Sequence, residues 1–229
     1  MSKYEVILFD ADETLFDFTK GQKEALIKTL EFYDIPPSEE IIGLYRTINN
    51  ATWQRFERNE INWDDLRKIR FTRLFDELGL SHDGLEANHY FLTNLANGGH
   101  LLPGAKELCE KLSKTHTLYI VTNGFSMVQH KRFENSEIKP CFADIFVSED
   151  IGYQKPQREY FDYVFEKIPS VDKKNILLVG DSLTSDILGA NNAGINSCWF
   201  NPNQKENQTN ASCTYEINTL TELIEIVNR

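Results

Sequence analysis

Two patterns of hydrophobic and polar positions divide this chain. Uninterrupted apolar runs, such as VILF at 6–9, LYIV at 118–121 and ILLV at 176–179, are bounded by polar residues. Runs of this length fit strands that are covered on both faces, as in a parallel sheet. From residue 19 to about residue 97, apolar residues recur instead at the spacing of amphipathic helices. The pattern therefore predicts a part that forms a sheet and a part that is helical.

After Pro103 and Gly104, helical and strand patterns alternate to the end of the sequence. The strand candidates lie in the segments TLYIVTNG, FADIFVSED, NILLVGDS and NSCWFNP, with helical segments between them. Such alternation favours a parallel sheet with helices on its faces. The predicted fold class is α/β, a Rossmann-like parallel sheet wound by helices on both faces, with an inserted all-helical cap domain.

The helical insert carries clear start and stop signals. Pro36 and Pro37 end its first helix, Ser38 opens the second, and Gly79 ends the third. We expect a core domain of residues 1–16 and 100–229 and a cap domain of residues 17–99. Because both ends of the insert enter the core near Asp10, we expect the cap to act as a lid over the strand ends.

Charge and composition exclude several classes of protein. A formal net charge of -11 over 229 residues argues against a nucleic-acid polymer as partner, because such binders neutralise phosphates with basic patches. No apolar stretch approaches the ~18 residues of a membrane helix, and no signal-peptide pattern is present, so we expect a cytoplasmic protein without membrane association. The four cysteines and five histidines lack the spacing of a zinc site or a disulfide framework. Nothing in the pattern indicates the oligomeric state.

Polar residues stand where four segments of the predicted sheet end. A single acid at such a place is commonly a helix cap or a turn former. Four polar strand ends in one sheet instead indicate a site, since ligands bind beyond the carboxyl ends of parallel strands. The candidate site residues are Asp10, Asp12, Glu13, Thr122, Asn123, Lys155, Asp181 and Asp186, together with the backbone of Gly124.

The chemistry of this set points to phosphoryl transfer. Carboxylates that converge repel one another unless they are protonated or hold a hard cation, and oxygen ligands favour Mg²⁺. Lys155 would offset negative charge, including that of a bound phosphate. Thr122 and the backbone N–H groups around Gly124 offer donors for phosphoryl oxygens. We therefore predict a metal-assisted site with a carboxylate available as nucleophile.

The ordered set of motifs resembles the haloacid dehalogenase (HAD) superfamily of phosphohydrolases. DADET at 10–14, VTNG at 121–124, KP at 155–156 and GDSLTSD at 180–186 are similar to its four motifs in their order, and the helical insert stands where such enzymes carry a type C1 cap. One departure is Glu13, where much of the superfamily has Gly. The chemistry does not depend on this position, and we expect Glu13 to be solvated.

The resemblance implies a two-step reaction. Asp10 would attack phosphorus and form an aspartyl-phosphate, while Asp12 protonates the departing alkoxide and later takes a proton from water. Thr122 and nearby amides would bind the phosphoryl group. Lys155 would pair with Asp10 and with the phosphate.

The resemblance also implies how Mg²⁺ is held. Asp10, the backbone carbonyl of Asp12 and Asp181 would be direct ligands. Asp186 would bind directly or through water.

The resemblance leaves alternatives to a phosphatase open. Haloacid dehalogenases share the nucleophile but do not need an acid-base carboxylate two residues after it. The presence of Asp12 therefore favours phosphate esters as substrates. A sugar-phosphate phosphatase or a phosphosugar mutase of the same superfamily would keep Asp12. A phospho-accepting receiver module also combines Asp, Thr, Lys and Mg²⁺, but such domains are ~120 residues long and place the acids differently.

The substrate is expected to be a small phosphate monoester. LFDF at 15–18, GYQKP at 152–156 and GDSLTSDI at 180–187 look similar to the pyrimidine 5'-nucleotidase-like branch, which implies a nucleoside monophosphate. Thr122, Asn123, Gly124 and Lys155 would bind its phosphate. Phe18 and Trp53 are candidates for stacking on the base, although helix packing also accounts for aromatic residues at such positions.

Overall fold

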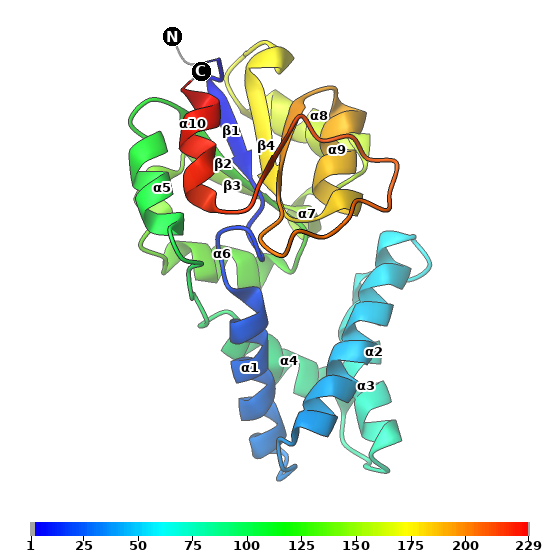
Figure 1. Cartoon of the computed structure of the whole chain (residues 1–229). Helices are drawn as coiled ribbons and strands as arrows, with labels where there is room; N and C mark the ends of the chain where they lie inside the picture. The colour runs from blue at the N-terminus through cyan, green and yellow to red at the C-terminus, as the bar shows by residue number, and fades with distance from the viewer. Residues whose placement is uncertain (1–2, 229) are drawn as a thin grey trace. The chain divides into compact units, whose positions relative to one another are not determined.

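The structure, a computed structural model, describes residues 3–228 (Figure 1). The chain divides into two compact units: Met1–Phe18 with Gly99–Arg229, here called the core, and Thr19–Gly98, here called the cap. Among the described residues, none of the helices has the length and apolar character needed to cross a membrane.

The core is built on one parallel sheet, which confirms the predicted fold class. Its six strands stand in the order β3-β2-β1-β4-β5-β6, and each pairs with its neighbours in parallel. The strands are β1 (Val6–Phe9), β2 (Thr117–Thr122), β3 (Asp144–Val147), β4 (Ile176–Gly180), β5 (Asn196–Phe200) and β6 (Tyr215–Ile217).

Both faces of this sheet are buried, which explains why the strands read as continuous apolar runs. Ile7 and Phe9 belong to one hydrophobic cluster, whereas Val6 and Leu8 belong to another. Because side chains alternate along a strand, these two clusters lie on opposite faces. The first cluster includes residues of α5 (Ala105–Leu112) and α10 (Leu223–Val227), and the second includes residues of α8 (Arg158–Lys167) and α9 (Leu188–Ala193).

The remaining helices of the core lie between the strands, except for the 3₁₀ turn η4 (Leu220–Glu222), which follows β6. Those between the strands are α6 (Ser126–Glu134), α7 (Ser148–Ile151), the π-helix η3 (Leu183–Ile187) and the short 3₁₀ turns η1 (Lys139–Cys141) and η2 (Lys173–Asn175). The segment between β4 and β5, predicted to be helical, thus begins with a π-helical turn before α9.

The cap consists of α2 (Glu39–Glu57), α3 (Trp63–Glu77), α4 (Gly84–Leu95) and nearly all of α1 (Phe18–Phe32). Ser38 caps α2 by accepting a hydrogen bond from the N–H of Ile41, at 3.3 Å, as the sequence predicts. Gly79 follows α3 with a positive φ of 67°, a conformation that glycine adopts without strain.

Candidate active site

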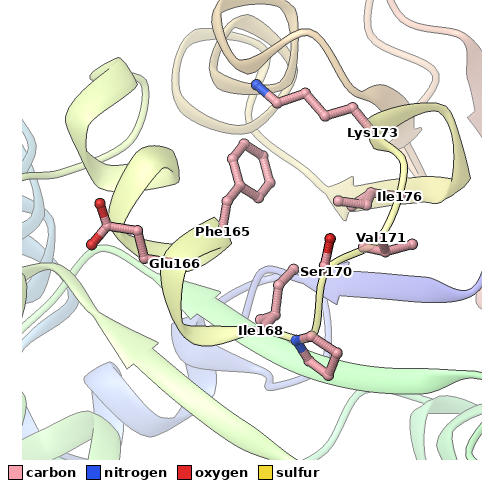
Figure 2. A pocket seen from close by; sticks show the side chains of 8 residues that line it. Phe165, Glu166, Ile168, Ser170, Val171, Lys173 and Ile176 are labelled. Carbon is pink, nitrogen blue, oxygen red and sulfur yellow. The ribbon is translucent and has the colours of Figure 1, made fainter.

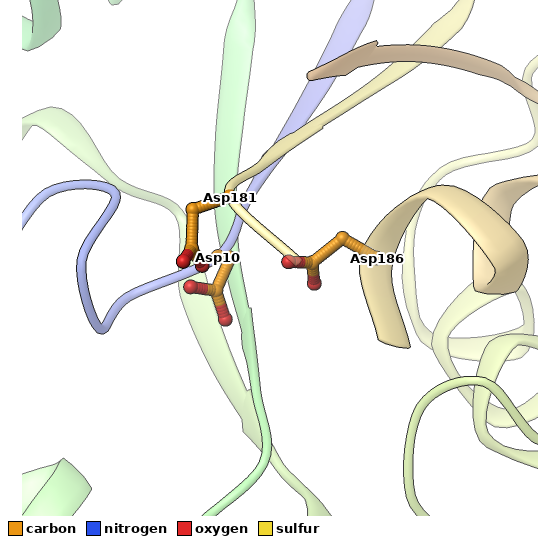
Figure 3. Close-up of side chains that lie close together, drawn as sticks. All are labelled: Asp10, Asp181 and Asp186. Carbon is orange, nitrogen blue, oxygen red and sulfur yellow. The ribbon is translucent and has the colours of Figure 1, made fainter. Parts of the chain in front are cut away.

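Three carboxylates converge where neighbouring strands end. Asp10 follows β1, Asp181 follows β4, and Asp186 projects from η3; Figure 3 shows the three carboxyl groups turned toward one another. One oxygen of each lies within 4.8 Å of the other two. The adjacency of β1 and β4 in the sheet brings Asp10 and Asp181 together.

Lys155 neutralises part of this negative charge. Its Nζ donates to Asp10 Oδ1 at 2.6 Å, to Asp186 Oδ1 at 2.7 Å and to the carbonyl oxygen of Val121 at 2.7 Å. These three acceptors engage all three ammonium protons. Burial by itself lowers the pKa of Lys155, but the carboxylates of Asp10 and Asp186 outweigh it and raise the pKa. Lys155 is therefore a fixed positive charge.

The carboxyl groups of Asp10 and Asp181 are difficult to ionise without a further cation. Burial, as the largest effect, raises the pKa of Asp10 to about 7, although Lys155 opposes the rise. Burial together with the neighbouring carboxylates of Asp10 and Asp186 raises the pKa of Asp181 to about 8. A divalent cation between them would favour their charged forms.

Asp186 depends on a glycine for its position. A Cβ on Gly180 would lie 2.3 Å from Asp186 Cγ, so only glycine allows this approach. The N–H of Ser182 donates to Asp186 Oδ2 at 3.0 Å, and Lys155 occupies Oδ1. Both oxygens of Asp186 thus already accept hydrogen bonds.

The turn that follows Asp10 orients its carboxylate. Thr14 is fully buried and donates its hydroxyl hydrogen to Asp10 Oδ2 at 3.2 Å, a role the sequence reasoning did not assign. Glu13 takes a left-handed backbone conformation, with φ at 61°, and its N–H donates to the carbonyl oxygen of Phe16 at 2.8 Å. The turn therefore has the conformation that favours glycine even though glutamate occupies it.

Asp12 does not join the three-carboxylate cluster through its side chain. Its Oδ1 accepts from Arg132 Nη2, and its Oδ2 accepts from Gln129 Nε2 at 2.9 Å. Sequence reasoning missed both partners. Their spacing of three places them on one face of α6, in the segment SMVQHKRFE that follows VTNG.

The last residue of β2 and the two residues after it differ in their hydrogen bonds. Thr122 Oγ1 is buried and has no hydrogen-bond partner within residues 3–228. The side chain of Asn123 instead binds the backbone of Lys155, with Oδ1 accepting from its N–H at 2.9 Å and Nδ2 donating to its carbonyl oxygen at 2.8 Å. The N–H of Gly124 donates to Ser148 Oγ at 3.1 Å. The side chain of Asn123 thus holds the backbone of Lys155, and the N–H of Gly124 binds the side chain of Ser148.

The two aromatic residues singled out in the sequence lie in packed surroundings. The guanidinium of Arg132 lies 5.7 Å from the ring centroid of Phe18. In the cap, the half-buried Trp53 makes edge contacts with Phe56, at 5.7 Å between centroids, and with Trp63, at 6.2 Å.

A surface hollow lies at the opposite end of the sheet. It has a volume of about 300 Å³ and adjoins Ile176, where β4 begins, whereas Asp181 follows the other end of that strand (Figure 2). Lys173 beside it donates to the carbonyl oxygen of Ala193 at 2.8 Å. The carboxylate cluster, and not this hollow, is the candidate active site.

Comparison with known proteins agrees with this assignment. The family model for haloacid dehalogenase-like hydrolases matches residues 4–194. The crystal structure of the HAD-hydrolase YfnB from Bacillus subtilis, described as bound to magnesium, superimposes with a TM-score of 0.94 at 42% identity, over 99% of this chain and 100% of that one.

Two further relatives are similar over nearly their whole length. The pyrimidine 5'-nucleotidase PynA of Streptococcus pneumoniae is 34% identical over 99% of this chain and 96% of its own. The pyrimidine 5'-nucleotidase YjjG of Escherichia coli is 32% identical over 98% of each chain.

Proposed function

This chain belongs to the haloacid dehalogenase-like hydrolase family, and we propose that it is a Mg²⁺-dependent phosphomonoester hydrolase that works through an aspartyl-phosphate. The observation that carries the proposal is the buried ion pair of Lys155 and Asp10, together with the buried hydroxyl of Thr122, which has no hydrogen-bond partner within residues 3–228. The first two groups supply a nucleophile and a positive charge for the phosphoryl group. The hydroxyl of Thr122 supplies a donor that the described part of the chain leaves unused.

The cluster fits Mg²⁺ by its donor set. Asp10, Asp181 and Asp186 offer only oxygen ligands, and the raised pKa values of Asp10 and Asp181 show the cost of their charges without a cation. Asp10 and Asp181, with the backbone carbonyl of Asp12, would hold the ion. Asp186 would bind the ion directly or through water. When bound, Mg²⁺ would supply positive charge that stabilises phosphoryl oxygens.

The reaction then proceeds in two displacements at phosphorus. A carboxylate oxygen of Asp10 forms a bond to phosphorus as the bond to the ester oxygen breaks, and Asp12 gives that oxygen its proton. Asp12 then takes a proton from water, whose oxygen attacks phosphorus and releases Asp10 and inorganic phosphate. Thr122 and Lys155 hold the phosphoryl oxygens in both steps. To do so, Lys155 gives up one of its present hydrogen bonds, such as the one to the carbonyl oxygen of Val121, and donates to a phosphoryl oxygen instead.

The substrate class we propose is pyrimidine nucleoside monophosphates. The support is the likeness over nearly the full length to PynA and YjjG, which are named pyrimidine 5'-nucleotidases. Phe18 and Trp53 remain our candidates for contacts to the base. Sugar phosphates are the competing substrate class.

A substrate screen tests this proposal. We expect Mg²⁺-dependent release of phosphate with a higher kcat/KM for UMP, dUMP and dTMP than for hexose phosphates, and loss of turnover in excess EDTA. Acid quenching during turnover followed by peptide mass spectrometry should find phosphate on the peptide that contains Asp10. Better turnover of a hexose phosphate would overturn the nucleotidase assignment, and a requirement for a bisphosphate activator would instead indicate a mutase.

A further inference from the structure

Asp12, Gln129 and Arg132 form a closed ring of hydrogen bonds. Arg132 Nη2 donates both to Asp12 Oδ1 and to Gln129 Oε1, the latter at 3.0 Å. Gln129 Nε2 completes the ring by donating to Asp12 Oδ2 at 2.9 Å. Both oxygens of Asp12 are thereby fixed by two residues of one helix turn of α6, and rotation of the carboxylate would break a bond at each oxygen.

The surroundings of this ring hold its members in place. The side chain of Arg132 is 1% exposed, and its guanidinium lies 5.0 Å from the ring centroid of Phe16 and 5.7 Å from that of Phe18. Gln129 lies against Gly124, where a Cβ would come within 2.7 Å of its Nε2. The glycine of the VTNG segment therefore makes room for the side chain that reaches Asp12.

Stability alone gives little reason for an arginine here. Removing a guanidinium from water is costly, and an apolar side chain of similar volume often stabilises a protein as well as a buried ion pair does. Arg132 is buried, while the side chain of its partner Asp12 is 23% exposed and so remains accessible to solvent and substrate. The arrangement fixes the one carboxylate to which the proposed reaction assigns both proton transfers.

We propose that Arg132, assisted by Gln129, is a positioning residue that fixes the carboxylate of Asp12 for both proton transfers. This inference rests on the proposed function, in which Asp12 protonates the leaving oxygen and then accepts a proton from water. A misplacement of a catalytic group by ~1 Å can cost ~10²-fold in rate. Loss of Arg132 should therefore slow the steps that use Asp12 and leave attack by Asp10 intact.

The dependence on the leaving group separates this role from a structural one. p-Nitrophenolate departs without protonation, so its release in the first step should survive loss of positioning. The second step, which needs Asp12 to accept a proton, should become slow. p-Nitrophenyl phosphate should then give a burst of one product molecule per active site, whereas an alkyl phosphate should be slow from the first step.

The experiment compares Arg132→Met with wild type on p-nitrophenyl phosphate and glycerol phosphate, by stopped flow and in the steady state. Asp12→Asn is the reference for complete loss of the acid-base group, expected at ~10²–10⁴-fold on the alkyl ester. We expect Arg132→Met to lose ~10- to 100-fold on glycerol phosphate and to gain a burst on p-nitrophenyl phosphate, with partial recovery in Arg132→Lys. Lys131→Met removes one charge from the exposed neighbouring position of α6 and should behave as wild type.

Each outcome separates the possibilities. If Asp12→Asn shows the leaving-group dependence but Arg132→Met matches wild type, or if Arg132→Met loses the same factor on both substrates without a burst, the positioning role is wrong. If Asp12→Asn itself has no such dependence, the proposed mechanism fails instead. Should Arg132→Met not fold, Gln129→Met removes only one of the two hydrogen bonds to Asp12, and the same pattern at smaller amplitude is expected.

Discussion

Lys155 Nζ lies 2.6 Å from Asp10 Oδ1, and both residues are buried. This pair explains how three carboxylates can share one place in the protein. When all are ionised, the charges of Asp10, Asp181 and Asp186 sum to -3, and Lys155 brings the total to -2. A divalent cation would make the cluster neutral, which agrees with the Mg²⁺ dependence that we propose.

Replacing Asp10 with Asn should abolish hydrolysis and preserve the fold. The amide keeps the shape of the carboxylate and can accept the hydrogen bond from Lys155, but it cannot act as the nucleophile. The loss of turnover can reach ~10⁶-fold when catalytic groups act as a unit. Steady-state kinetics and circular dichroism check this, and activity within tenfold of wild type would show that another group attacks phosphorus.

Mg²⁺ affinity should increase as the pH rises through the range about 6 to 8. The folded-state pKa values of about 7 for Asp10 and about 8 for Asp181 lie above ordinary carboxyl values. The metal-free protein therefore holds protons that Mg²⁺ must displace, and affinity gains up to ~10-fold per pH unit for each proton released. Titration calorimetry in two buffers with different ionisation enthalpies measures this release. Asp181→Asn should bind Mg²⁺ more weakly and release fewer protons.

The same pKa shifts have a defined sign for stability. Between the unfolded carboxyl pKa of ~4 and the folded values, the native state holds protons that the unfolded state has lost, so the stability of the metal-free protein falls as the pH rises. Saturating Mg²⁺ offsets this loss by binding only the folded state, by ~2.7 kcal/mol at one hundred times its Kd. At one fixed Mg²⁺ concentration, the increase in Tm on adding the ion should be larger at ~pH 8 than at ~pH 6, because the Kd falls as the pH rises. An equal increase at both values would contradict the raised pKa values.

The sequence predicted the parts of the site that strand ends create. Parallel strands have their carboxyl ends on the same side of the sheet. Asp10 and Asp181 each follow an apolar run, so they could be placed on that side before the strand order was known. The ring around Asp12 could not be predicted in this way. Gln129 and Arg132 follow an ordinary amphipathic pattern, and only the packing of α6 in the tertiary structure determines that they reach Asp12.

Local pattern could not give the partner of the Asn123 side chain. That side chain forms a reciprocal pair with the backbone of Lys155, a residue 32 positions away. Hydrogen bonds between distant segments have no signal in residue spacing. The π-helical turn at Leu183–Ile187, which carries Asp186, likewise has no signal in the residue spacing.

Asn123→Ala should destabilise the protein and impair catalysis through Lys155. The change leaves the N–H and the carbonyl oxygen of Lys155 without their side-chain partner, at a cost of about 1–3 kcal/mol. Chemical denaturation and steady-state kinetics measure the two effects. Asn192→Ala is the matched control. Asn192 is exposed, and its side chain donates at 2.9 Å to the carbonyl oxygen of Pro156, the residue that follows Lys155. We expect a smaller effect there, and equal effects would show that the Lys155 backbone needs no anchor.

Glu13→Gly should be more stable than Glu13→Ala. Both variants remove the carboxylate, but only glycine removes the Cβ that disfavours the φ of 61°. The left-handed conformation costs ~1–2 kcal/mol for a residue with a Cβ. That exceeds the ~0.5–1 kcal/mol of additional backbone entropy that glycine loses on folding. Urea denaturation of the two variants measures the difference, and a more stable alanine variant would contradict strain at this turn.

Trp53→Ala should narrow the preference for pyrimidine nucleotides without abolishing hydrolysis of p-nitrophenyl phosphate. By analogy with single-strand binders, stacking of an aromatic side chain on a base contributes ~1–3 kcal/mol, or roughly 5- to 150-fold in kcat/KM. Trp63→Ala is the matched control, because Trp63 is also half-buried, shares the neighbour Phe56 with Trp53, and contacts Trp53 itself. Any loss of cap packing should affect both variants alike, so the ratio of kcat/KM for UMP to that for a hexose phosphate should fall only in Trp53→Ala. If the ratio falls equally in both variants, or in neither, Trp53 does not recognise the base, and the preference has to arise from other residues.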